Sequence, residues 1–401
     1  MNAMNHVAAA VASLDYDRLL VAMTNACRVT GKRNTLPILD HVTITASRGG
    51  AQVCGTDLDR YFTTFVPGQV DKGFACILDA HKLLAVLKKA KAARTVNLSV
   101  DGDQVVMSIG KLNVTTTPTA SIDDVPQQKF REGLKKSNCS FILKAEVLAR
   151  ILQRVTFAVS TEETRYYLNG TFMHVVQRAG YTFDPKTGDP SNTHLPKLTF
   201  AATDGHRLAR YEIDVPAGAE AMPDEGVIIP RIATDELSRL LKRKGCPAEI
   251  MVTVTDTGIS FLIGEDELLE SKLIEGTFPD YTRVLPSGND HRLEIMPSLL
   301  IEAVTQASTI LTERGRAVRL KLGDGWLRAS CKDPEFGTTE MTIAAENETP
   351  LEIGFNVGYL LEVLARVEGK AVIKFADCGA PVLVSDTDDD CVLYCLMPMR
   401  V

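Results

Sequence analysis

The stretch ILKAEVLARIL (142–152) decides the fold, because it joins a short apolar strand, a polar break and an amphipathic helix. Its helical part follows the i, i+3, i+4, i+7 spacing of one apolar helix face. The same pattern occurs six times along the chain. The other copies are LDYDRLLVAM from Leu14, ILDAHKLLAVL from Ile77, IIPRIATDELSRLL from Ile228, IMPSLLIEAV from Ile295 and FNVGYLLEVL from Phe355. Such a repeat predicts an array of similar structural units.

The spacing of the six copies is nearly constant. Their starts are 63, 65, 86, 67 and 60 residues apart. The long interval contains RAGYTFDPKTGDPSNTH (178–194), whose Gly, Pro, Asn and Asp content predicts an inserted loop. Between the helices, alternating segments such as HVTITA (41–46), EIMVTV (249–254) and VRLKL (318–322) predict strands of sheets with one buried face.

One helix on a small sheet cannot cover that sheet, so pairing the six units into three domains is the economical arrangement. We therefore expect an α+β fold of three similar domains, each with two helices packed on antiparallel sheets. Polar stretches at 130–138 (FREGLKKSN) and 286–292 (PSGNDHR) indicate the boundaries. The predicted domains are 1–138, 139–290 and 291–401.

Composition limits the class of protein. The 401 residues, 45% hydrophobic and 24% charged, are typical of a globular chain with a substantial core. The net charge of −7 argues against a surface that grips nucleic acid everywhere. Nine cysteines without a C-x-x-C pair indicate a reducing compartment, so we expect a cytoplasmic protein. No apolar run approaches the roughly 20 residues of a membrane helix, so we expect no membrane partner.

The motifs that could carry chemistry favour no active site. In ATDGHRLARY (202–211), Asp204 and His206 could form an acid–base or metal pair, but Asp204 and Gly205 also form a turn signal and no third ligand is evident. SDTDDD (385–390) lacks the Gly and Glu of a calcium loop and reads as a solvated hairpin tip. Nucleotide-binding and hydrolase signatures are also missing. We predict no catalytic residue, no metal and no cofactor.

Charge is segregated along the chain. The helical stretches 82–94, 144–154 and 231–244 contain thirteen basic residues and three acidic ones, which leaves the rest of the chain at −17. Helices of one class are therefore basic in an otherwise acidic protein. Three hypotheses remain at this point: a DNA-binding module without catalysis, a hydrolase or metal enzyme centred on Asp204 and His206, and a repeat scaffold that binds only proteins.

Seven strings occur in the order of one known family. They resemble the bacterial replicative sliding clamp, the beta subunit of DNA polymerase III, and span all three expected domains. The strings are RNTLPIL (33–39), GTDLD (55–59), RYYLNG (165–170), ATDGHRL (202–208), SKL with G.FPDYTRVLP (271–286), IGFNVGYLLEVL (353–364) and YCLMPMRV (394–401).

The resemblance implies a head-to-tail homodimeric ring of the DNA-clamp fold, a processivity factor that encircles duplex DNA. Basic helices inside the ring would contact phosphates, which carry no sequence information, so the ring would slide on any duplex. The implied partners are the catalytic subunit of the replicative polymerase, the clamp loader and other proteins with a clamp-binding motif.

The resemblance also implies site residues. A partner-peptide cleft between the second and third domains would include Arg165, Leu168, Thr203, Gly205, His206, Arg207, Leu208, Pro279, Arg283, Val284, Asn356, Cys395, Leu396, Met397, Pro398, Met399, Arg400 and Val401. Duplex DNA would contact Arg33, Tyr166 and Tyr167, and we add Lys88, Lys89, Arg150 and Arg154 from the basic helices. The dimer seam would use Leu112 and Val114 on an edge strand and Ile310 and Leu311 at a helix end.

Three departures from the family pattern alter these expectations. Glu162 stands where relatives often carry an uncharged amide, which affects a DNA contact there. The N-terminus is several residues longer and 178–194 is additional. At the seam, smaller side chains replace an aromatic residue, so a weaker interface is expected.

Overall fold

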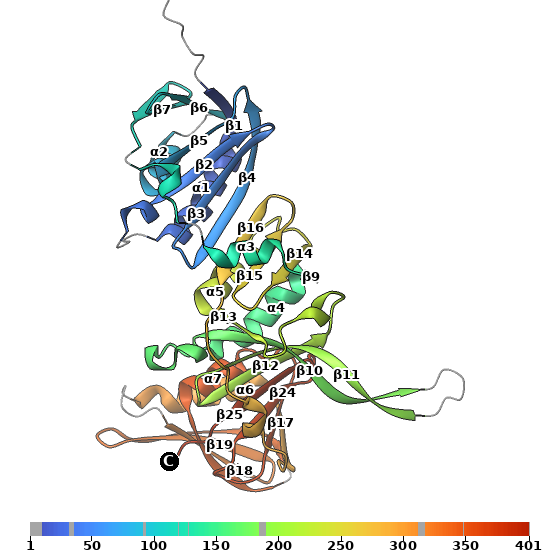
Figure 1. The fold of residues 1–401 in the computed structure, drawn as a ribbon. Coiled ribbons are helices and arrows are strands. Elements are labelled where there is room, and N and C mark those ends of the chain that lie inside the picture. The colour runs from blue at the N-terminus through green and yellow to red at the C-terminus, as the bar shows by residue number, and fades with distance from the viewer. Residues whose placement is uncertain are drawn as a thin grey trace, which may run out of the picture. The chain divides into compact units, whose positions relative to one another are not determined.

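The computed structural model describes residues 10–31, 36–90, 94–118, 120–126, 128–183, 190–311, 317–347 and 349–400. The chain forms two compact units, each built from two segments. Unit 1 comprises Met1–Ala145 and Leu240–Leu273, and unit 2 comprises Glu146–Arg239 and Ile274–Val401. Figure 1 shows the elements along the chain from blue to red.

All six helices predicted from the repeat are present, and each directly follows a strand. They are α1 (Tyr16–Thr30), α2 (Ala80–Lys89), α4 (Ala145–Val155), α5 (Arg231–Leu241), α6 (Pro297–Ala307) and α7 (Val357–Leu364). The preceding strands are β1 (Ala10–Asp15), β5 (Phe74–Asp79), β9 (Cys139–Lys144), β13 (Val227–Pro230), β17 (His291–Ile295) and β22 (Leu351–Asn356). In three copies the polar break is an N-cap: the side chains of Asp15, Asp79 and Asn356 accept hydrogen bonds from backbone N–H groups.

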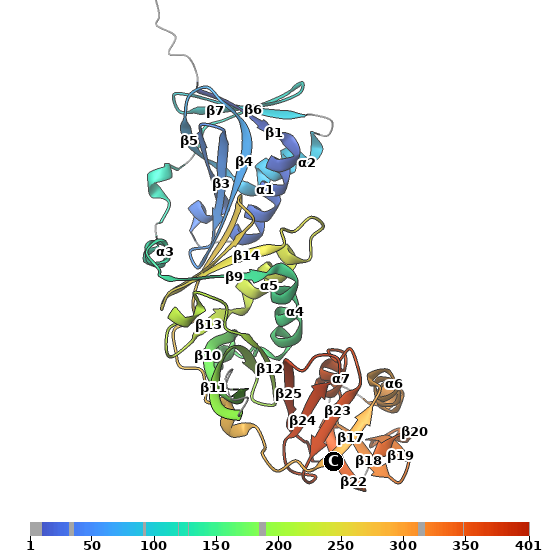
Figure 2. The same ribbon diagram turned by 90° about the vertical axis from the view of Figure 1, so that its right-hand side faces the viewer.

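Unit 1 contains one antiparallel sheet of twelve strands with the order β8-β7-β6-β1-β4-β16-β15-β14-β9, from which β2, β3 and β5 branch. Helices α1 and α2 lie side by side against it (Figure 2). Leu19, Met23 and Leu87 are among the fully buried residues of this core. Its further strands are β2 (His41–Ser47), β3 (Gly50–Thr56), β4 (Arg60–Val70), β6 (Thr95–Asp101), β7 (Gln104–Ile109), β8 (Leu112–Thr116), β14 (Glu249–Val254), β15 (Gly258–Ile263) and β16 (Glu267–Lys272).

Unit 2 contains a nine-stranded sheet, β13-β10-β11-β12-β25-β24-β23-β17-β21, and a four-stranded sheet, β20-β19-β18-β22. The C-terminal strand β25 pairs with β12 on one side and with β24 on the other, so it unites two parts of the sheet. The further strands are β10 (Gly170–Phe183), β11 (Pro190–Thr203), β12 (Arg207–Asp214), β18 (Ala317–Gly323), β19 (Trp326–Asp333), β20 (Gly337–Ala344), β21 (Glu346–Asn347), β23 (Ala371–Phe375), β24 (Val382–Asp386) and β25 (Val392–Leu396).

One sequence prediction about a connection was wrong. The stretch 178–194, predicted to be a loop, is largely a continuation of the β10–β11 hairpin, with pairs from Arg178↔Leu195 to Phe183↔Pro190. Its Tyr-Thr-Phe segment favours extended backbone more strongly than the neighbouring glycine opposes it. The stretch 130–138, where we expect a domain boundary, contains a short helix that the sequence did not predict, α3 (Lys129–Lys135), which buries Phe130 and Leu134 beside Tyr61.

Within the described residues, no helix is both long enough and apolar enough to cross a membrane. Five of the nine cysteines are buried, as expected of small apolar side chains: Cys27, Cys76, Cys139, Cys331 and Cys395.

Candidate functional site

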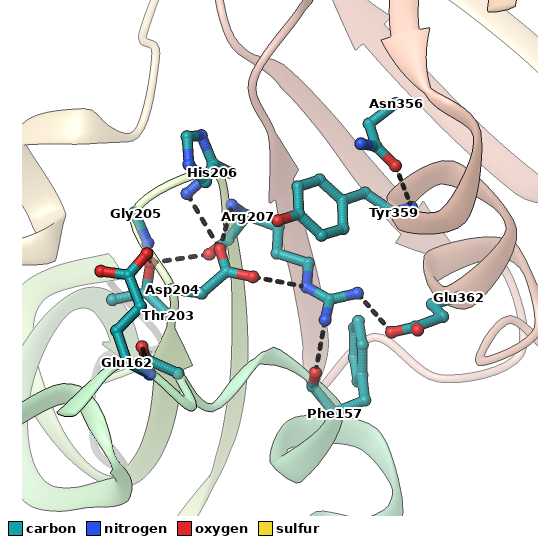
Figure 3. Close-up of polar contacts among 11 residues, drawn as sticks. Phe157, Glu162, Thr203, Asp204, Gly205, His206, Arg207, Asn356, Tyr359 and Glu362 are labelled. Carbon is teal, nitrogen blue, oxygen red and sulfur yellow. Dashed lines mark hydrogen bonds and ion pairs between the residues drawn. The ribbon is translucent and has the colours of Figure 1, made fainter. Parts of the chain in front are cut away.

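The string TDGHRL forms a tight turn between β11 and β12. The Thr203 hydroxyl donates to the carbonyl of Arg207 (2.6 Å) and accepts from the N–H of Gly205 (3.1 Å). One carboxylate oxygen of Asp204 accepts from the N–H groups of His206 (2.9 Å) and Arg207 (3.0 Å) (Figure 3). Gly205 has φ of 89°, a left-handed conformation that few other residues adopt. The turn interpretation of Asp204 and Gly205 is confirmed.

Arg207 links three segments of unit 2. Its Nε donates to Asp204 (3.1 Å), one Nη donates to the carbonyl of Phe157 (2.8 Å) and the other pairs with Glu362 of α7. The guanidinium also lies 4.6 Å from the ring centroid of Tyr359 (Figure 3). Only 9% of the side chain is exposed. The contacts of Arg207 therefore hold the turn in place against α7.

Beside this turn lies a cluster of buried apolar side chains, which supports the exposed side chains of the site. Its members come from the 3₁₀ helix η4 (Glu163–Leu168), from β12 and β25, and from the 3₁₀ helix η6 (Tyr281–Val284). They include Leu168, Leu208, Phe278, Tyr281 and Cys395. Residues distant in sequence therefore meet because β25 pairs with β12, Leu208 opposite Cys395.

Three apolar side chains stand exposed at the same site. Val284 is 50% exposed, Met399 43% and Met397 41%. The C-terminal tail that carries the two methionines is held by backbone hydrogen bonds, from Met397 N–H to His206 O (2.9 Å) and from Met399 N–H to Gly354 O (2.8 Å). Flexible thioether side chains on a fixed backbone suit a surface that adapts to different apolar ligands.

Charged and polar groups surround the apolar surface. Arg165 pairs with Glu162 (3.3 Å) and Arg283 with Asp280 (2.9 Å), and all four side chains are largely exposed. Exposed ion pairs of this kind contribute little to stability and exchange partners readily. The ring of His206 stacks on Tyr359 at 5.9 Å between centroids.

The structure thus brings most of the predicted cleft residues together within unit 2. The described members belong to η4, the 202–208 turn, η6, the start of α7 and the chain's end, whereas Val401 lies outside the described residues. Sequence reasoning missed Phe157, Tyr359 and Glu362, the partners of Arg207. Tyr359 and Glu362 lie within the string IGFNVGYLLEVL (353–364). The resemblance of that string to the family was therefore the signal that could have identified them.

His174 is a further residue that sequence reasoning missed. Its Nε2 lies 2.9 Å from the hydroxyl of Tyr281, and its ring stacks on Phe172 at 4.3 Å between centroids. Burial, with a smaller contribution from the Arg178 charge, lowers the pKa of His174 to about 4. His174 is therefore neutral at pH 7. Its contact with the Tyr281 hydroxyl supports η6.

The geometry does not favour catalysis at Asp204 and His206. The Asp204 carboxylate is committed to the turn and to Arg207, and the His206 ring lies on Tyr359. In the part of the chain that the structure describes, one group of possible metal ligands is close enough to share an ion, Asp389, Asp390 and Cys391. Burial and the two neighbouring carboxylates raise the pKa of the Cys391 thiol to about 11, so without a metal ion this thiol is protonated at neutral pH.

The residues predicted to contact DNA have different environments. Lys88 and Lys89 on α2 and Arg150 on α4 are exposed, and Tyr166 is 56% exposed. Tyr167 packs edge-on against Tyr166 with ring centroids 5.8 Å apart. Arg33 lies outside the described residues.

The prediction that Arg154 contacts DNA was wrong. Its side chain is 2% exposed and pairs with Glu368 (3.1 Å), Asp386 (3.3 Å) and Asp389 (3.8 Å). The stretch 385–390 is correspondingly not a fully solvated tip, because Asp386 and Asp389 are buried. A cation removed from water needs such anionic partners, and the carboxylates lie more than 200 residues away in sequence.

The residues predicted for the dimer seam lie on two elements of different units. Leu112, 41% exposed, and the half-buried Val114 belong to β8, an edge strand of the unit 1 sheet. Ile310 ends the 3₁₀ helix η7 (Ser308–Ile310) that follows α6, and Leu311 is the next residue; both are half-buried.

Comparison with known proteins covers nearly the whole chain. Models of the DNA polymerase III beta subunit match in order: its N-terminal domain at 13–129, its central domain at 142–280 and its C-terminal domain at 282–400. The beta sliding clamp of Caulobacter vibrioides is 34% identical over 388 residues, 96% of this chain and 98% of the relative. The clamp of Pseudomonas aeruginosa is 30% identical over 399 residues, 97% and 99% of the two chains.

Solved structures agree with the sequence matches. The sliding clamp of Bartonella birtlesii bound to griselimycin has a TM-score of 0.84 and 36% identity, with 98% of this chain and 100% of that chain covered. The Caulobacter crescentus clamp, solved with bound PEG, has a TM-score of 0.87 and 32% identity at the same coverage. The chain therefore belongs to the family of the DNA polymerase III beta subunit, the bacterial sliding clamps, which are non-catalytic processivity subunits of the replicative polymerase.

Proposed function

We propose that two copies of this chain close head-to-tail into a ring around duplex DNA and that the surface of Val284, Met397 and Met399 binds short peptides of its partners. The partners would be the polymerase catalytic subunit, the clamp loader and other proteins with a clamp-binding motif. We further propose domain boundaries at 1–138, 139–290 and 291–401 and a cytoplasmic location.

The main evidence for the peptide site is the C-terminal tail, which exposes apolar side chains while backbone hydrogen bonds hold it in place. An exposed apolar terminus favours misassociation unless it serves as a contact surface, yet Met397 and Met399 stay exposed while their backbone is anchored. Leu168 and Leu208 lie buried at this site, so a peptide side chain would add to an existing apolar cluster. The griselimycin complex of the Bartonella birtlesii relative supports a ligand-binding surface on clamps of this family.

The exposed cations support a DNA contact that depends on charge and not on sequence. Lys88, Lys89 and Arg150 lie at helix surfaces, and Tyr166 offers an exposed phenol. Contacts to phosphates release counterions, so binding to linear duplex should be weak and should fall with salt. The family resemblance supports Arg33, Tyr166 and Tyr167 as further proposed contacts to DNA.

Deleting Met397–Val401 tests the peptide site. We expect the deletion to abolish binding of a polymerase-derived peptide in isothermal titration, because it removes two of the three exposed apolar side chains. Met399→Ala alone should weaken binding by about 1–2 kcal/mol, the effect of truncating one pocket wall.

Met251→Ala serves as the control, since Met251 is 43% exposed on β14 in unit 1. It should leave peptide affinity unchanged. The mass of each variant in light scattering shows whether assembly survives. Unchanged affinity after the deletion, in a protein that retains its wild-type mass, would place the peptide site elsewhere.

A further inference from the structure

Phe336 is the most exposed of the large apolar side chains that the structure describes, at 77%. It lies in the turn between β19 and β20. The turn is ordered, because the buried Asp333 carboxylate accepts from the N–H groups of Glu335 and Phe336, both at 2.9 Å. A large ring held in water by a fixed turn gains little burial within its own unit, so its apolar area is available to a second surface.

The turn belongs to the part of unit 2 that contains the proposed seam. The hydroxyl of Thr339, three residues after Phe336, donates to the carbonyl of Ala307, the last residue of α6. Helix η7, which ends in Ile310, contacts both β19 and β20. Strand β20, which begins just after Phe336, therefore lies against the end of α6 that leads to Ile310 and Leu311.

Strand β20 is also an open edge. In the described residues it pairs only with β19, and Glu340 is the one charged residue between Gly337 and Ala344. Strand β8 is one of the end strands of the unit 1 sheet: among the described residues it pairs only with β7, and its residues, Leu112–Thr116, are uncharged. Natural proteins usually protect such edges with charges, proline or a covering element. When two copies meet head-to-tail, the open β20 edge of one copy can lie against the open β8 edge of the other.

We propose that Phe336 packs on the Leu112–Val114 edge of a second copy of this chain and is the aromatic anchor of the seam. This inference rests on the proposed ring and identifies the main anchoring side chain of its subunit interface. The other predicted seam residues are aliphatic, so the ring of Phe336 supplies the aromatic group that they lack. Leu112, 41% exposed, offers the complementary apolar contact.

Dilution of Phe336→Ala, followed by mass photometry, tests the anchor. Truncating a buried aromatic anchor costs an interface about tenfold in affinity or more. Because a two-copy ring contains the seam twice, the dimer dissociation constant should rise by about 100-fold. Ile142→Ala is the matched control, since Ile142 is 50% exposed on β9, and Phe336→Tyr should retain the dimer. A dissociation constant for Phe336→Ala equal to that of Ile142→Ala would overturn the inference.

A second variant separates this inference from the ring itself. Ile310→Asp with Leu311→Asp should give folded monomer. If that variant dissociates while Phe336→Ala does not, the ring stands and the anchor is wrong. If the wild-type protein is monomeric at every accessible concentration, the proposed ring fails.

Photo-cross-linking identifies the contact directly. With p-benzoyl-phenylalanine in place of Phe336, irradiation should yield covalent dimers whose cross-links lie in 105–116 of the second copy. Cross-links confined to the same chain, or formed only with another protein, would contradict the assignment.

Discussion

His174 occupies an unusual position for a titratable side chain, with its ring stacked on Phe172 and its Nε2 at the hydroxyl of Tyr281. Arg178, Arg210 and Glu212 are the charged groups that act on it. Burial is the largest cause of its low pKa. Since Tyr281 begins η6, the neutral imidazole helps to hold the helix that carries Arg283 and Val284.

We expect the stability of unit 2 to rise with pH between about 4 and 6.5 because of His174. The folded-state pKa of about 4 lies below the ordinary value, so the unfolded chain binds more protons in this range. The slope approaches about 1.4 kcal/mol per pH unit. Denaturant titrations followed by the fluorescence of Trp326, the one tryptophan, report on unit 2.

The variant His174→Phe should keep the ring packing and remove this pH dependence. The control His206→Phe changes a histidine of the same unit that is exposed at the turn, and it should retain the wild-type slope. A slope that persists in His174→Phe would assign the linked proton to another group.

The identity of individual site residues was only partly predictable from the sequence. The Asp204–Gly205 turn follows from local chemistry, because both residue types favour turns. The remaining cleft residues came from the family resemblance. His174 and Arg154 could not be assigned, since their environments depend on Tyr281, Asp386 and other residues that only the fold brings close.

At the scale of elements, Arg154 connects helix α4 to the end of strand β24. Burial alone would raise the pKa of Asp386, but the backbone N–H groups of Glu368, Asp388 and Gly369, together with the Arg154 charge, hold it below its ordinary value. Glu368 and Asp389 complete the surroundings of the guanidinium. The pairing therefore fixes α4 against the hairpin that leads to the C-terminal strand β25.

We expect Arg154→Met to destabilise unit 2 by about 3–5 kcal/mol, because it leaves buried carboxylates without their cation. The loss should be smaller at pH 4, where protonation of an unpaired carboxylate becomes easier. Denaturation followed by Trp326 fluorescence measures both values. Arg150→Met, four residues earlier on the same helix and exposed, should change stability by less than about 0.5–1 kcal/mol. Equal effects of the two substitutions would contradict the role of Arg154.

The elements were predicted better than their connections. Six helices followed from apolar periodicity, and in three of them the polar break is the side-chain cap that begins the helix. Helix α3 was missed because its two apolar residues, Phe130 and Leu134, are too few for a periodic signal. The extended β10–β11 hairpin was missed because turn-forming residues are interspersed with its strand formers.

At the scale of the whole molecule, the proposed retention on DNA depends on the topology of the ring. A surplus of acidic residues makes most of the surface unfavourable for DNA, while the exposed cations Lys88, Lys89 and Arg150 are the proposed local phosphate contacts. Such contacts are weak at physiological salt and independent of sequence. In the proposed ring, long residence on DNA comes from closure around the duplex and not from affinity.

Retention on circular DNA measures this directly. Nicked circles are incubated with the protein and a clamp loader, bound protein is isolated by gel filtration, and the circles are then cut once with a restriction enzyme. The account predicts that the protein stays with intact circles in moderate salt and leaves after the cut. Protein that remains equally bound to the linearised DNA, or that binds short linear duplex as tightly as it is held on the circle, would contradict the ring.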